Sequence, residues 1–123
     1  MAVGSYGDCA LLLANQAAEA IRKEFPTTLV GFLAYGRAGA LPEKVKKGEP
    51  NVLASVATNF NWKTSVPRLI QEWPRIVPHV TIYDYYAIAA WGSQAPDNNQ
   101  PNVEQIARSL REWHAAEIGR AHV

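Results

Sequence analysis

The chain has 123 residues, of which 48% are hydrophobic and 19% are charged, and its formal net charge is +1. This composition provides a core for one small domain and excludes a disordered tail or a strongly basic nucleic-acid-binding protein. Its apolar runs are shorter than the roughly 18 residues that a membrane-spanning helix needs, so we expect no membrane span.

One cysteine and three histidines limit the redox and metal chemistry of the chain. A single cysteine excludes an internal disulfide. Free cysteines are usually buried and inert, so we expect Cys9 to lie in the core or at its boundary. The histidines are far apart in the sequence and lack metal-ligand spacing, so we expect neither a metal nor another cofactor.

The first predicted element is a helix that begins at Ser5. This residue and Asp8 form an S-x-x-D pattern, which is typical of a capping box. Apolar residues then recur at helical spacing, and Pro26 is expected to end the helix. The predicted buried stripe consists of Leu11, Ala14, Ala18, Ile21 and Phe25.

Three later segments are predicted to be strands, because they are short, apolar and bounded by Gly, Pro or polar residues. They cover residues 29–36, 51–58 and 80–86, and residues 37–50 read as a loop. The first two lack alternation, which is typical of strands covered on both faces of a parallel sheet. The loop is just long enough for a crossover, so these two strands could be parallel neighbours.

Two more helices complete the prediction. Ser65 and Pro67 mark the start of the first one, and Pro74 is expected to end or kink it. Asn102 is expected to cap the last helix. Their apolar faces consist of Val66, Leu69, Ile70 and Trp73 in the first, and of Val103, Ile106, Leu110 and Trp113 in the second.

The predicted order is therefore α-β-β-α-β-α, which indicates an α/β fold with about three parallel strands. Three such strands make a poor free-standing sheet, because both outer strands would be open edges. A closed (β/α) barrel has eight strands and needs about 250 residues. We therefore expect residues 1–116 to be part of a TIM-type barrel that packs against the rest of its own domain.

The last residues, 117–123, have an unusual sequence for a helix end. They can be reverse-translated as GAG ATC GGA AGA GCA CAC GTC, which resembles the adapter ligated to DNA for short-read sequencing. The next adapter codon would be a stop. The hypothesis is that this segment is a translated adapter rather than an ordinary frayed C-terminus.

Three ordered stretches carry a resemblance to a known family. They are residues 15–26, residues 30–35 and residues 72–86, the last ending in the motif YDYY. Together they resemble domain-of-unknown-function family 4838, a bacterial barrel domain that is similar to glycoside hydrolases. That family often occurs in secreted or periplasmic proteins beside an α-glucuronidase-like N-terminal domain. The resemblance implies a carbohydrate partner, while the family's acidic, Gly-rich segment upstream of the first helix is absent here.

Function in a parallel barrel sits at the carboxyl ends of the strands and in the loops that follow them. Aromatic faces, amides, carboxylates and guanidinium groups at these positions are the mixture that a sugar site needs. The candidate binding residues are Tyr35, Arg37, Asn59, Asn61, Trp62, Tyr85, Tyr86 and Trp91.

Asp84 is the candidate catalytic residue, since a carboxylate at a strand end could serve as general base, nucleophile or hydroxyl acceptor. Glycoside hydrolysis normally uses two carboxylates, roughly 5 to 10 Å apart, and no second one follows a predicted strand. A binding or structural role for Asp84 therefore remains open.

Several other residues have a simpler structural interpretation. Trp73 and Trp113 lie on apolar helix stripes and are expected in the core. His79 precedes the third strand, so it is expected at the opposite, stabilising edge. The lysines at 44, 46 and 47 are expected in a solvated loop.

Three hypotheses follow. The chain could be part of a glycoside-hydrolase-like domain, part of a non-catalytic carbohydrate-binding barrel, or a small autonomous α/β scaffold domain. No G-x-G-x-x-G or Walker motif follows a predicted strand, which argues against a nucleotide-binding enzyme.

Overall fold

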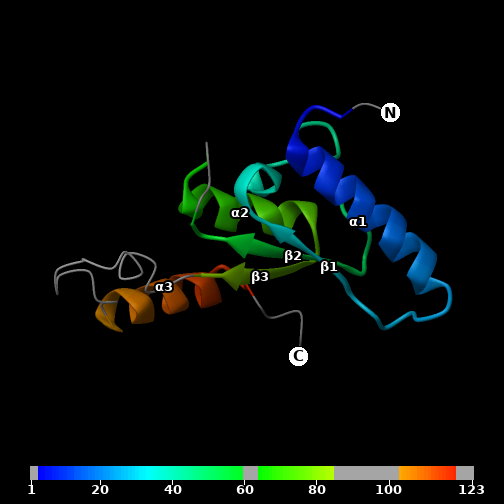
Figure 1. Ribbon diagram of the computed structural model, residues 1–123. Coiled ribbons are helices and arrows are strands. Elements are labelled where there is room, and N and C mark those ends of the chain that lie inside the picture. The colour runs from blue at the N-terminus through cyan, green and yellow to red at the C-terminus, as the bar shows by residue number, and fades with distance from the viewer. Residues whose placement is uncertain (1–2, 60–63, 85–102, 119–123) are drawn as a thin grey trace, which may run out of the picture.

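A computed structural model of the chain describes residues 3–59, 64–84 and 103–118 (Figure 1). The helices and strands follow the predicted order, and a short 3-10 helix, η1, is added after the first strand. In chain order the elements are α1 (Tyr6–Arg22), β1 (Val30–Ala34), η1 (Gly36–Gly39), β2 (Val52–Ala57), α2 (Val66–Ile76), β3 (His79–Tyr83) and α3 (Val103–Ala115). None of these helices has the length and hydrophobicity that crossing a membrane requires.

The three strands form one parallel sheet in the order β1-β2-β3. Val30 is paired with Val52, and Ala54 is paired with Val80, so the register brings residues of the same face together across the sheet. Sequential order with parallel pairing confirms the prediction of a partial α/β fold.

One face of the sheet is covered by α1 and α2 and forms the core (Figure 1). Trp73, a residue of α2, is fully buried and packs edge-on against Phe32 of β1, with ring centroids 5.6 Å apart. The placement of Trp73 in the core is thus confirmed. The buried cluster contains Leu11, Ala14, Ala18, Ala34, Val52, Ala54, Val56, Leu69, Trp73, Val77 and Val80.

The opposite face of the sheet is more open among the described residues. Leu33 of β1 and Tyr83 of β3 are 45% and 41% exposed. Only β2 approaches the continuous burial that was predicted for the first two strands, because it is the central strand. β1 instead alternates between partly buried and exposed residues.

The first turn of α1 confirms the predicted capping box. The Ser5 hydroxyl accepts from the Asp8 amide, and the Asp8 carboxylate accepts from the Ser5 amide. The expectation for Cys9 was wrong: it is exposed, because it follows Asp8 on the face of α1 that points away from the sheet. Phe25 was also misassigned, since α1 ends before it and its side chain is 54% exposed.

The other helices agree with the prediction in position and differ from it in detail. Ser65 precedes α2 without making a side-chain capping bond, while Pro67 occupies the first turn. Pro74 does not end the helix, which continues to Ile76. On α3 the predicted stripe is buried only at Trp113, while Ile106 is half-buried and Val103 is 77% exposed.

The segment interpreted as adapter-derived falls mostly outside the described residues. Ile118 is described and packs against the core, and its amide donates to the Trp113 carbonyl. Glu117 has a φ of 64°, which closes the last turn after α3. The origin of this segment stays a prediction.

Candidate functional site at the carboxyl edge of the sheet

Parallel pairing places the ends of all three strands at one edge of the sheet (Figure 1). Tyr35 directly follows β1, Asn59 follows β2 by two residues, and Asp84 directly follows β3. The Thr58 amide donates to the Tyr83 carbonyl at 3.1 Å and so continues the ladder beyond the strands. This bond keeps the segments that carry Asn59 and Asp84 side by side.

Asn59 and Asp84 meet at this edge. The Asn59 Nδ2 donates to the Asp84 Oδ1 at 3.4 Å and to the Thr58 Oγ1 at 3.3 Å. Both distances exceed the usual 2.7–3.2 Å of an N–H···O bond, so these contacts are weak. Both side chains are half-buried. Among the described residues, Asn59 is the donor to the Asp84 carboxylate.

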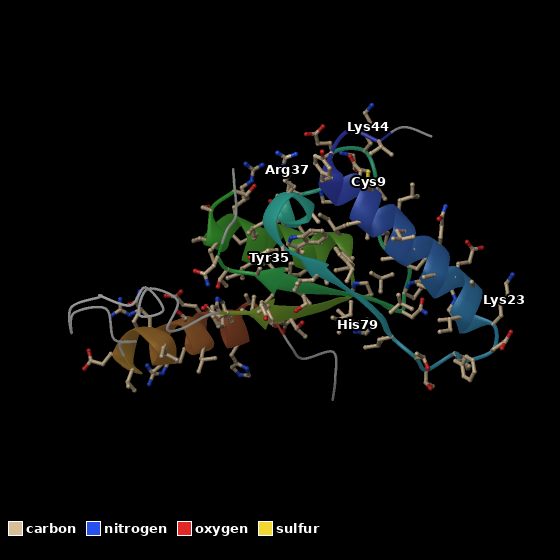
Figure 2. The ribbon with its side chains drawn as sticks, viewed as in Figure 1. Cys9, Lys23, Tyr35, Arg37, Lys44 and His79 are labelled. Atoms are coloured by element: carbon tan, nitrogen blue, oxygen red, sulfur yellow. The ribbon has the colours of Figure 1, made fainter. Side chains whose placement is uncertain are left out.

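Arg37 lies on η1 and points toward the beginning of α1 (Figure 2). Its Nη1 donates to the Tyr6 hydroxyl at 3.3 Å, and its Cζ lies 5.4 Å from the centroid of the Tyr6 ring. This is a cation–π arrangement reinforced by a hydrogen bond. Tyr35 is 37% exposed at the same edge. The edge therefore presents two tyrosine rings, a guanidinium group and the Asn59–Asp84 pair.

Asp8 is a second carboxylate near this end of the molecule, but it has a structural environment. It is fully buried, and its Oδ2 accepts from the amides of Gly4 and Ser5 at 2.9 and 2.8 Å. Its Oδ1 accepts from the amides of Lys44 and Val45 at 2.9 and 2.7 Å. Burial would raise the pKa of the Asp8 carboxyl, but these backbone donors outweigh burial and hold its pKa well below the usual range.

The family model described as Domain of unknown function (DUF4838) matches residues 2–121, which is almost the whole chain. The chain belongs to this family. No curated protein and no solved structure matches it significantly. The resemblance inferred from the ordered sequence motifs is thereby confirmed at the level of the family.

For this DUF4838 chain, the sequence-predicted site residues fall into three groups. Asn59 and Asp84 are brought into contact. Tyr35 and Arg37 lie at the same edge, with Arg37 turned toward α1. The remaining candidates, Asn61, Trp62, Tyr85, Tyr86 and Trp91, lie outside the described residues.

Sequence reasoning missed Tyr6. It is the first residue of α1 and is 59% exposed, and nothing in its local pattern distinguishes it from a surface residue. Its contact with Arg37 joins residues 31 positions apart, so it depends on how η1 packs against α1. The capping signal at Ser5 locates the start of the helix but not its partner.

His79 lies at the other end of the sheet from Tyr35 (Figure 2). Its Nε2 is 3.1 Å from the Pro50 carbonyl oxygen, which agrees with its expected structural role. Within the described ranges, no group of three or more His, Cys, Asp or Glu residues could hold a metal ion. The described residues at the carboxyl edge offer hydrogen bonding, ring stacking and charge.

Proposed function

We propose that this chain is part of a carbohydrate-active (β/α) barrel and that its carboxyl edge binds an oligosaccharide. The observation that carries this proposal is the Asn59–Asp84 contact beside the exposed Tyr35. The three residues come from the ends of three neighbouring strands.

The side-chain chemistry suits a sugar. A tyrosine ring can stack on the C–H face of a pyranose while its hydroxyl remains hydrated. A carboxylate accepts hydrogen bonds from ring hydroxyls, and an amide both donates and accepts. Because the contact between Asn59 and Asp84 is long, sugar hydroxyls could replace it at little cost in free energy.

The architecture supports a barrel. Consecutive parallel strands with α1 and α2 on one face form the repeating unit of a (β/α) barrel. Leu33 and Tyr83 would then point into the barrel interior, where further strands would cover them. The functional edge of such a barrel is the carboxyl edge, where Asn59 and Asp84 meet.

Binding is the primary proposal, and hydrolysis is the alternative. Asp84 is the single carboxylate that directly follows a strand among the described residues. Hydrolysis would require a second carboxylate roughly 5 to 10 Å away, contributed by another part of the domain. Binding needs only the groups already in place.

A binding experiment tests the proposal. The purified chain is titrated with oligosaccharides prepared from plant and bacterial polysaccharides, with calorimetry as the readout and sugar release as a second assay. Asp84→Asn keeps the shape of the side chain and removes its charge, and we expect about tenfold weaker binding. The matched control is Glu24→Gln, an exposed carboxylate beyond the C-terminal end of α1, which should bind like wild type.

The outcomes separate the three hypotheses. Binding that weakens in Asp84→Asn but not in Glu24→Gln supports the proposed site. Release of sugar that stops in Asp84→Asn favours the hydrolytic alternative. A folded chain that binds no oligosaccharide contradicts the proposal and favours a scaffold domain.

A further inference from the structure

We propose that a groove at the amino edge of the sheet binds an acidic polypeptide segment that also carries apolar side chains. The groove is lined by residues 47–50, which precede β2, and by residues 74–78, which precede β3. His79, labelled in Figure 2, begins β3 at this edge. The amino-edge groove therefore lies at the opposite edge of the sheet from the proposed carbohydrate site and does not depend on it.

Hydrogen bonds hold the two walls of the amino-edge groove in place. Asn15 of α1 donates from Nδ2 to the Lys47 carbonyl at 3.1 Å, and its Oδ1 accepts from the Glu49 amide at 2.8 Å. Between these two bonds, the Gly48 amide donates to the Ile76 carbonyl at 2.7 Å and so ties one wall to the other. A groove that is shaped before its ligand arrives loses little conformational entropy on binding.

The surface of the groove is largely apolar and rigid. Pro50, Pro74 and Pro78 are exposed, and Ile76 is half-buried beside them. A proline ring has almost no side-chain freedom to lose when a ligand covers it. The groove has a volume of about 670 Å³ and is open to solvent. An open, apolar groove suits the side chains of a segment that enters and leaves it, rather than an enclosed small molecule.

Charge complementarity favours an acidic partner. Lys47 and Arg75 place one positive charge on each wall. Glu49, the carboxylate among the described lining residues, is neutralised by Arg22 at 2.7 Å. Arg75 contacts Glu72 at 3.3 Å, which occupies one of its five N–H donors, and its side chain remains 73% exposed. A carboxylate of the partner can therefore reach both cations.

The end of α2 favours a polypeptide over a simple polyanion. The last four carbonyls of an α-helix have no partner within the helix. The Ile76 carbonyl accepts from Gly48, and Pro74 and Arg75 belong to the same last turn and line the groove. A peptide backbone brings N–H donors to such carbonyls, whereas sulfate groups bring only acceptors. The groove thus offers apolar surface, cations and carbonyl oxygens to one extended segment.

The test compares two matched peptides with the full chain of residues 1–123. The probe is a fluorescent decapeptide of alternating glutamate and leucine, and its counterpart has glutamine in place of glutamate. Binding is measured by fluorescence anisotropy. Two exposed ion pairs should make the glutamate peptide bind about fivefold more tightly than the glutamine peptide. This preference should shrink as salt is raised.

Arg75→Gln should weaken binding of the glutamate peptide about threefold and leave the glutamine peptide unchanged. The matched control is Arg68→Gln, which removes the same charge from an exposed position on the same helix that does not line the groove. Circular dichroism confirms that each variant is folded.

A second variant should act in the opposite direction. Glu72→Gln removes the carboxylate that competes for Arg75, so binding of the glutamate peptide should strengthen about twofold. Glu24→Gln makes the same change in net charge beyond the end of α1 and should bind like wild type.

Equal affinity for the two peptides, or binding of neither, overturns the proposal. An equal loss in Arg75→Gln and Arg68→Gln also overturns it, since the effect would be one of net charge. Dextran sulfate is the probe for a polyanion without apolar side chains. If it displaces the glutamate peptide and binds at least as tightly, the assignment to a polypeptide partner is overturned.

Discussion

Asp8 and Asp84 are both aspartates next to the end of a regular element, yet their surroundings differ. Asp8 is fully buried and accepts hydrogen bonds from the amides of Gly4, Ser5, Lys44 and Val45. Asp84 is half-buried, and among the described residues its carboxylate accepts one long contact, from Asn59. Among the described residues, the number of donors thus separates Asp8, which stabilises the fold, from Asp84, which we propose serves a ligand.

The largest expected effect is the loss of stability in Asp8→Asn. The substitution replaces one carboxylate oxygen by an amide nitrogen, which donates hydrogen bonds and cannot accept them. At least two backbone N–H groups that bond to a carboxylate oxygen in wild type therefore lose their acceptor. Leaving such donors buried without partners should lower the free energy of unfolding by about 2–4 kcal/mol. Urea denaturation followed by circular dichroism measures this change. A loss below about 1 kcal/mol would show that the Asp8 network contributes little.

A smaller loss is expected when the close approach beside Asp8 is disturbed. In Gly7→Ala the added methyl group would meet the Ala40 carbonyl, which belongs to the backbone and cannot turn aside. We expect a destabilisation of about 1–2 kcal/mol, even though alanine is the better helix former. The control is Gly31→Ala in β1, where the nearest atom is the Leu53 Cδ2 at 3.6 Å and the methyl group fits. A stable Gly7→Ala variant would mean that residues 36–40 can move away from α1.

Acid should remove the charge-dependent part of the Asp8 contribution. Its pKa is lowered in the folded state relative to the unfolded value of 3.8, so the stabilisation is complete above that value. It is lost as the pH falls below 3.8 toward the lower pKa of the folded state. The difference in unfolding free energy between wild type and Asp8→Asn should therefore be constant from neutral pH to about 5 and shrink in more acidic solution. A difference that does not change with pH would exclude this origin.

The sequence predicted the order of elements because each left a local signal. The Ser5–Asp8 spacing located α1, and short apolar runs bounded by breakers located the strands. The Asp8 network was only half predictable, because the bonds to Lys44 and Val45 join residues 36 and 37 positions apart. A capping motif gives no information on which loop packs against it.

The same limit applies to the core and to the site. Asn51 is buried and its Nδ2 donates to the Ala18 and Thr28 carbonyls, yet it read only as the first residue of a strand. Asn59 and Asp84 were both chosen because they follow strands, and they lie in contact because parallel register places such positions side by side. A search of strand ends cannot find Tyr6, because Tyr6 reaches this edge from α1, a helix that precedes the sheet.

The smallest expected change in stability is that of Asp84→Asn. The contact with Asn59 is 3.4 Å long, and the carbonyl oxygen of the substituted side chain can still accept from the Asn59 amide. The free energy of unfolding should therefore change by less than about 0.5 kcal/mol, while affinity for oligosaccharide falls about tenfold. Urea denaturation and calorimetric titration of one preparation measure both quantities. If Asp84→Asn were as unstable as Asp8→Asn, then Asp84 would be a structural residue. The contrast between the two carboxylates, and the site built on it, would then fail together.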